Sequence, residues 1–164
     1  MTRQLNVCSV TKDVILRDAC REDGQDILSL IRRVRADHSV DGGPEALDED
    51  LVDVERSYFA ARGWFGLLIK DNHIIGTCGI LAIDERTCEL RKMYLLREYQ
   101  GQGLGRALME VALKRAKDLG FQEVVLESNS SLKRARALYE KAGFAECAPH
   151  HLTEKCDYTM RKVL

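Results

Sequence analysis

Gln100-Gly101-Gln102-Gly103-Leu104-Gly105-Arg106 is the stretch that decides the fold of this 164-residue chain. The apolar pair Leu95-Leu96 precedes it, and apolar residues follow it at helical spacing, which predicts a helix over residues 103–119. The glycines therefore lie where a strand gives way to a helix. The first N–H groups of a helix have no partner within it, so this turn predicts a site for a phosphate-bearing cofactor.

Two familiar phosphate-binding patterns fit this turn poorly. A mononucleotide P-loop ends in Gly-Lys-Ser/Thr, whereas this turn continues as Gly105-Arg106-Ala107. A dinucleotide-binding turn has the spacing G-x-G-x-x-G near the first strand of its sheet, but these glycines are spaced G-x-G-x-G and follow several expected strands. The form that remains is Q/R-x-x-G-x-G/A, met by Gln100, Gly103 and Gly105. Glycines of this kind also occur in purely structural turns.

This form resembles the acyl-coenzyme A loop of the GNAT family of N-acetyltransferases. Two further stretches strengthen the resemblance: residues 89–95 (ELRKMYL) look like the fourth strand of that family, and residues 138–144 (LYEKAGF) look like its downstream signature. The chain departs from the family pattern at Arg97, where proline is usual, and at Leu132, where some members carry a cofactor-contacting asparagine. Two separated motifs in the family's order are far more specific than the glycines alone.

The expected elements follow one another in an order that agrees with this family. The fold class we expect is α/β (α+β), with a mixed, mostly antiparallel central sheet of about six or seven strands flanked by helices, in one domain over residues 1–164. A hydrophobic content of 45% suits one such core. The expected strands cover residues 14–17, 64–70, 73–83, 88–96, 124–126, 144–147 and 157–163, and the expected helices cover 27–34, 51–59, 103–119 and 132–142.

The resemblance implies acetyl-coenzyme A as the acyl donor and no metal. Its pyrophosphate would lie on the main-chain N–H groups of the glycine turn, and its pantetheine arm would lie along the backbone of the fourth strand. The residues expected to contact the cofactor are Met93, Tyr94, Leu95, Gln100, Gly101, Gln102, Gly103, Leu104, Gly105, Arg106 and Tyr139.

Acyl transfer from a thioester to an amine needs a base for the amine and an acid for the departing thiolate. Tyr139 matches the family's proton donor, although a tyrosine here could simply pack against the Gly143-Phe144 turn. Glu127, at the end of a buried strand, is the first candidate for the base, and Glu89 on the preceding strand is the second. Either glutamate could instead form a structural ion pair with a neighbouring cation.

Composition and charge indicate which kinds of partner and cellular location to expect. A formal net charge of −1 argues against nucleic acid, and the longest apolar stretch is far shorter than a membrane-spanning helix. The six cysteines contain no C-x-x-C pair, so we expect reduced thiols, no metal and a cytoplasmic location. We expect His38, His73 and the pair His150-His151 to lie in loops.

Three functions fit the resemblance. The first is direct acetyl transfer to the primary amine of a small molecule, favoured by the helical region 47–59. The second is acetylation of a protein amino terminus or lysine, since Glu127 matches the base of ribosomal-protein N-terminal acetyltransferases. The third is a non-catalytic acyl-coenzyme A sensor. The turn-rich segment 37–44 is expected to shape the acceptor site, and a homodimer is expected by analogy with relatives.

Overall fold

The computed structural model describes residues 6–37, 45–149 and 156–164 of the chain. Its centre is an eight-stranded sheet with the order β1-β2-β3-β4-β5-β6-β8-β7. The strands are β1 (Val7–Thr11), β2 (Val14–Asp18), β3 (Trp64–Lys70), β4 (His73–Ala82), β5 (Thr87–Leu95), β6 (Glu123–Ser128), β7 (Ala145–Cys147) and β8 (Tyr158–Val163). All neighbouring pairs are antiparallel except β5 and β6. The expected mixed, mostly antiparallel sheet flanked by helices is confirmed.

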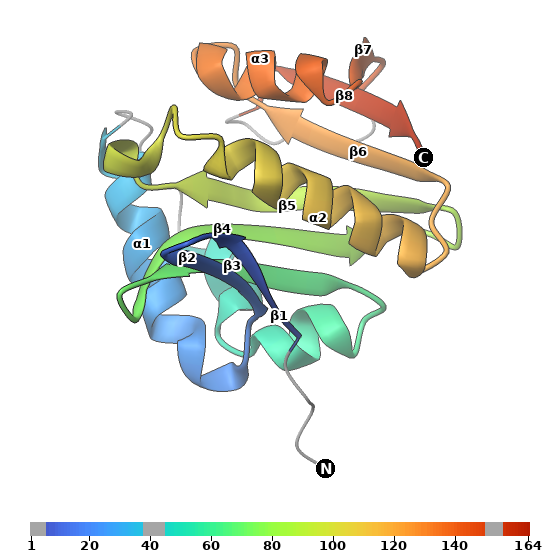
Figure 1. The fold of residues 1–164 in the computed structure, drawn as a ribbon. Coiled ribbons are helices and arrows are strands. Elements are labelled where there is room, and N and C mark those ends of the chain that lie inside the picture. Colours follow the sequence, from blue (N-terminus) through green and yellow to red (C-terminus); the bar gives the residue numbers. More distant parts are fainter. Residues whose placement is uncertain (1–5, 38–44, 150–155) are drawn as a thin grey trace.

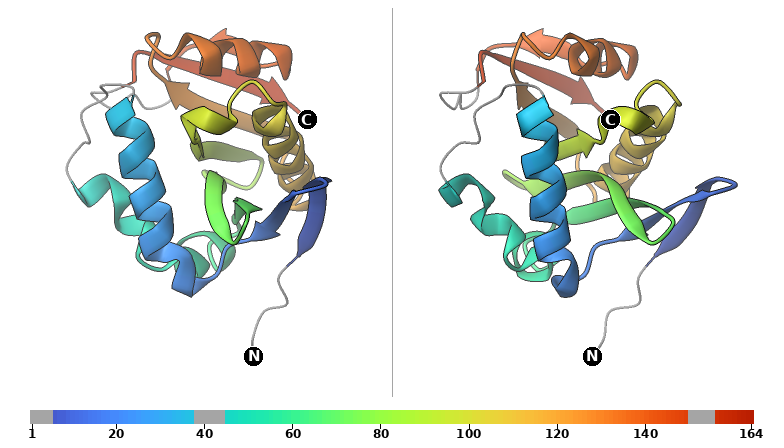
Figure 2. Two further views of the ribbon diagram at one scale, coloured as in Figure 1. Left: turned by 60° about the vertical axis from the view of Figure 1, so that its left-hand side comes forward. Right: turned by 90° about the vertical axis from the view of Figure 1, so that its left-hand side faces the viewer.

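Two helices cover the sheet from opposite sides. The helix α1 (Gly24–Asp37) buries Ile27, Leu30, Ile31 and Val34, and α2 (Leu104–Asp118) buries Leu108 and the alanines on the same stripe. Figure 2 shows α1 and α2 on the two sides of the central strands. A third helix, α3 (Lys133–Lys141), lies with β6, β7 and β8 in the C-terminal part of the molecule (Figure 1).

The structure differs from the expected elements in two places. The sheet has one strand more than the upper expected count, because Val7–Thr11 pairs with β2 as an exposed edge strand that carries no strong apolar alternation. The expected second helix is irregular: a short 3-10 helix, Glu45–Leu51, precedes one π-helical turn, Glu55–Phe59. The apolar side chains of this region are nevertheless buried as expected, with Leu51, Val54 and Tyr58 at 1% exposure or less.

Candidate active site

The glycine turn leads directly from β5 into α2. Gly101 and Gly103 have φ angles of +77° and +81°, the left-handed region that glycine adopts without strain. Nothing lies within 4 Å of the position that a Cβ would take on either residue. The backbone of the turn is therefore open to a ligand on the side where other residues carry a side chain.

The N–H groups at the start of α2 point out of the helix without a main-chain acceptor. The first helical hydrogen bond runs from Ala107 N to Gly103 O at 3.0 Å, so the N–H groups of Leu104, Gly105 and Arg106 precede the ladder. Gly103 also offers no side chain to cap them. Unpaired donors and the positive end of the helix dipole together fit a phosphate group.

The two glutamines of the turn have a different role from the glycines. The Gln100 side chain donates to Leu95 O at 3.0 Å, and the Gln102 side chain donates to Glu98 O at 3.0 Å. Both side chains therefore fasten the turn to the segment before it. Arg134 on α3 reaches the same turn and donates to the Gln100 side-chain oxygen at 3.4 Å. Arg134 is 34 residues away from Gln100 in the sequence, and only the fold brings it to the turn.

The strands β5 and β6 pair only over the first three residues of each. The parallel register covers Thr87↔Glu123, Cys88↔Val124 and Glu89↔Val125 and then stops, although β5 continues to Leu95 and β6 to Ser128. The pairing of β5 with β4 also shifts near this point. Thr77 pairs with Tyr94 and Gly79 with Arg91, so β5 has a bulge in which two residues, Lys92 and Met93, lie opposite one residue of β4. Beyond Glu89, a gap therefore opens between two strands of one sheet.

Lys92, in the bulge of β5, is the centre of an ion-pair network. Lys92 has a φ of +54° and its Nζ lies 2.8 Å from Asp48 Oδ1 and 3.2 Å from Asp50 Oδ1. Asp48 also accepts two hydrogen bonds from Arg35 at 2.8 and 3.1 Å, and Asp50 accepts one from the Tyr58 hydroxyl. This network ties α1 and the 45–59 region to the strand that borders the gap.

The predicted cofactor residues Met93, Tyr94 and Leu95 run from the bulge to the end of β5 and are all half-buried. The Tyr94 hydroxyl accepts a hydrogen bond from Arg35 Nε of α1 at 3.3 Å. The three residues lead straight into the glycine turn through the short helix Arg97–Tyr99. The backbone of β5 is thus continuous with the glycine turn.

The two candidate bases lie on one face of the sheet. Glu89 pairs in register with Val125, and side chains alternate along a strand, so Glu127 faces the same side as Glu89 one step further along the gap. Glu89 is held loosely, since its Oε2 lies 3.8 Å from Arg91 Nε. Glu127 stands opposite Thr159 of β8. The structure thus brings both glutamates to the gap.

Tyr139 lies on α3 and is 8% exposed. Its ring packs edge-on against Phe144, with 6.2 Å between the ring centroids. Burial, and then the neighbouring Tyr158, Cys78 and Tyr94, raise the pKa of the Tyr139 phenol well above its ordinary value. The phenol is therefore protonated at neutral pH, which suits a proton donor, and the packing role is also observed.

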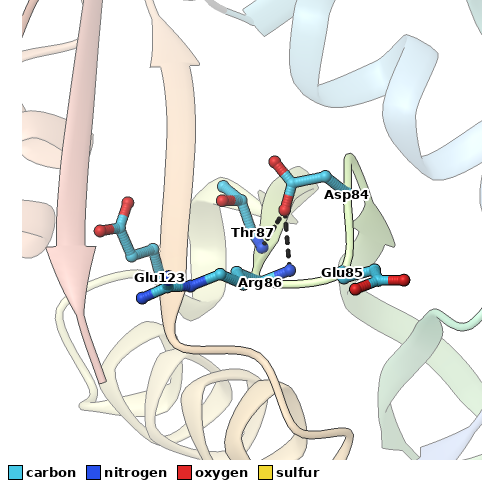
Figure 3. A pocket seen from close by; sticks show the side chains of 5 residues that line it. All are labelled: Asp84, Glu85, Arg86, Thr87 and Glu123. Carbon is cyan, nitrogen blue, oxygen red and sulfur yellow. Dashed lines mark hydrogen bonds between the residues drawn. The ribbon is translucent and has the colours of Figure 1, made fainter.

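A surface pocket at the other end of β5 is not part of this site. Figure 3 shows its lining by Asp84, Glu85, Arg86, Thr87 and Glu123. Asp84 Oδ1 accepts hydrogen bonds from the N–H groups of Arg86 and Thr87 at 2.7 and 2.8 Å, so this carboxylate closes the β4–β5 turn. The length of β5, about 26 Å, separates this pocket from the glycine turn.

The described ranges contain no candidate metal cluster and no disulfide. No group of three or more His, Cys, Asp or Glu side chains there could hold a metal ion. All six cysteines are free thiols, and Cys78 and Cys88 are buried. His73, expected in the hairpin turn, is instead the first residue of β4, and its Nδ1 lies 2.6 Å from Asp71 O in the turn. His38, His150 and His151, with most of the 37–44 segment, lie outside the described residues. Within the described part of the chain, every helix is too short or too polar to cross a membrane.

Comparison with known proteins agrees with this geometry. The acetyltransferase (GNAT) family matches residues 28–144. An uncharacterized N-acetyltransferase of Escherichia coli (strain K12), YjgM, is 30% identical over 135 residues, which cover 79% of this chain and 81% of that protein.

Solved structures share the fold at lower identity. An acetyltransferase from Streptococcus agalactiae has a TM-score of 0.86 at 21% identity and covers 94% of this chain and 100% of its own. The PaiA N-acetyltransferase from Thermoplasma acidophilum, solved in complex with coenzyme A, has a TM-score of 0.72 at 22% identity, covering 92% and 99%. The chain belongs to the GNAT family and is an acetyl-coenzyme A-dependent acetyltransferase.

Proposed function

We propose that this enzyme transfers the acetyl group of acetyl-coenzyme A directly to the primary amine of a small molecule. The observation that carries the proposal is the gap between β5 and β6, which runs from the glycine turn to the two glutamates. In this proposal the N–H groups of residues 101–106 bind the pyrophosphate, and the backbone of residues 93–95 binds the pantetheine arm. The open left-handed glycines and the unpaired helix donors support this assignment.

The transfer needs proton movements at the acceptor nitrogen and at the departing sulfur, and we assign the first to a glutamate beside the gap and the second to Tyr139 of α3. Glu127 takes a proton from the ammonium group of the acceptor, and Glu89 is the second candidate for this role. The freed nitrogen attacks the thioester carbonyl, the carbon–sulfur bond breaks, and Tyr139 donates its phenolic proton to the departing sulfur. The attacking nitrogen then loses its second proton, which reprotonates the Tyr139 phenolate, and Glu127 releases the first proton to solvent. The pKa of Tyr139 lies above its ordinary value, so the phenol starts the reaction protonated, as a proton donor must.

Release of free thiol tests the proposal. The purified protein is mixed with acetyl-coenzyme A and a panel of small amines, and coenzyme A is measured with a thiol reagent. We expect amine-dependent release, reduced on the order of a hundredfold to ten-thousandfold by Glu127→Gln and by Tyr139→Phe. A comparable loss in Glu89→Gln, with Glu127→Gln near normal, would move the base to Glu89.

Two results would replace this function with another. Coenzyme A binding without release for any amine would indicate a sensor. Release with peptide amino termini or lysine side chains, and not with small amines, would indicate a protein-modifying enzyme.

A further inference from the structure

Arg91 stands opposite Glu127 across the gap. Glu89 pairs with Val125, and two residues further along each strand come Arg91 and Glu127, at the same level and on the same face. No strand pairing joins β5 and β6 at this level. A guanidinium and a carboxylate therefore border the gap from its two sides.

The Arg91 guanidinium has few close polar contacts among the described residues. Among the described residues it forms no hydrogen bond, and its ion pair with Glu89 is long, at 3.8 Å. Its side chain is 32% exposed, so part of it reaches solvent. Lys92, the next residue of β5, is by contrast tightly engaged, with its Nζ 2.8 Å from Asp48 Oδ1. An arginine carries five donors in a planar fork, and most of these donors remain available here.

The charges around Arg91 favour an acceptor with two ends of opposite charge. Burial lowers the pKa of Arg91, but nearby Tyr58, Glu89, Asp50 and Glu127 raise it by more, so the group stays fully charged. The carboxylates attract an ammonium group. The guanidinium fork matches a carboxylate in geometry and charge.

We propose that Arg91 is a specificity-determining residue that binds the carboxylate of an amino acid-like acceptor, while the amine of the same molecule lies at Glu127. This inference rests on the proposed function and narrows its substrate class. A free amino acid has the required carboxylate a few bonds from its amine. The amino terminus of a protein has a neutral amide in that place and would leave the fork unpaired.

Paired acceptors that differ in one group test this assignment. Each of several amino acids is compared with its own carboxamide by the thiol-release assay, at saturating acetyl-coenzyme A. We expect the wild type to prefer the free acids by about tenfold to a hundredfold in kcat/KM, the size of one charge-assisted bond. The difference should appear mainly in the KM for the acceptor.

Substitutions of Arg91 distinguish a role in acceptor binding from a role in folding. Arg91→Gln should abolish the preference by raising the KM of the acids, and Arg91→Lys should retain part of it because the charge remains without the fork. Arg86→Gln is the matched control, since Arg86 is an exposed arginine just before the other end of β5. Coenzyme A affinity and thermal unfolding of each variant show whether the fold is intact.

The outcomes are distinct. Equal use of acids and carboxamides by the wild type, or an unchanged preference in a folded Arg91→Gln variant, would overturn the role of Arg91 while leaving acetyl transfer in place. Absence of transfer to every amine would overturn both proposals.

Discussion

The ammonium group of Lys92 lies 2.8 Å from Asp48 Oδ1, and the two side chains are only 5% and 8% exposed. Lys92 adopts a left-handed backbone conformation at the bulge of β5, and its carbonyl accepts a hydrogen bond from Thr77 Oγ1 at 2.7 Å. The ion pair therefore fixes the point at which β5 changes register against β4. It also joins that point to the 45–59 region.

Removing this ammonium should destabilise the whole domain. Lys92→Met leaves the buried carboxylate of Asp48 and the partly buried carboxylate of Asp50 with less compensation, and we expect a loss of about 3–5 kcal/mol in the free energy of unfolding. Urea denaturation measures it. Lys114→Met is the control, because the Lys114–Asp118 pair is exposed and should contribute within about 0.5 kcal/mol. Equal effects of the two substitutions would contradict the structural role of Lys92.

The same network predicts acid sensitivity. Burial raises the pKa of Asp48, but hydrogen bonds from Arg35 and Lys92 outweigh it, so the pKa lies below its ordinary value. A carboxyl with a lowered folded-state pKa stabilises the fold above its unfolded pKa, and this contribution is lost as the pH falls through the folded value.

We therefore expect the free energy of unfolding to fall as the pH drops below about 4. Asp48→Asn should be less stable at neutral pH and should show a weaker pH dependence in this window. Denaturation curves collected between neutral and acidic pH provide the measurement. An Asp48→Asn variant with the slope of the wild type would show that other carboxyls dominate.

Substitution in the glycine turn should separate strain from cofactor binding. Gly103→Ala places a side chain in a left-handed position at the start of α2, whereas Gly120→Ala does so just after its end, where φ is +84°. Both variants should lose about 1–2 kcal/mol of stability. Only Gly103→Ala should also weaken coenzyme A binding, measured by calorimetry. Unchanged affinity in a folded Gly103→Ala variant would count against phosphate binding at this turn.

Arg134 should contribute to cofactor affinity through its charge. It reaches the glycine turn, whereas Arg136 on the same helix is engaged by Glu140 and Glu146 at 3.0 and 2.8 Å. We expect Arg134→Gln to raise the Kd for coenzyme A by about threefold to tenfold and to reduce the salt dependence of binding. Arg136→Gln is the comparison and should leave the Kd within error. The reverse ranking would place the cofactor's phosphates elsewhere.

The sequence predicted the parts of the fold that local patterns encode. Gly101 and Gly103 signalled the turn, and the apolar stripe after them signalled α2, because both depend on residues close together in the chain. The edge strand Val7–Thr11 was missed because its exposed residues show no core-facing alternation. The 45–59 region was expected as a regular helix because its apolar spacing does not distinguish an α-helix from 3-10 and π-helical turns.

Candidate site residues could be named from the sequence only where they belong to a recognisable motif. Glu89, Glu127 and Tyr139 could be named from their positions in motifs, and the fold brings the two glutamates to one gap. Nothing in the sequence marked Lys92 as a buried cation, since its partners lie more than forty residues earlier and its bulge depends on strand register. Arg91 facing Glu127 also follows from register alone, which no local pattern determines.

The half-paired strand β5 gives this protein an edge in the middle of its sheet. An exposed edge usually recruits another chain through main-chain hydrogen bonds. If the pantetheine arm occupies this edge, main-chain groups of β5 bind the acyl donor. The side chains along the opening are then not needed for donor recognition. The choice of acceptor can then change through side-chain substitutions along the opening, while the backbone that binds the donor stays the same.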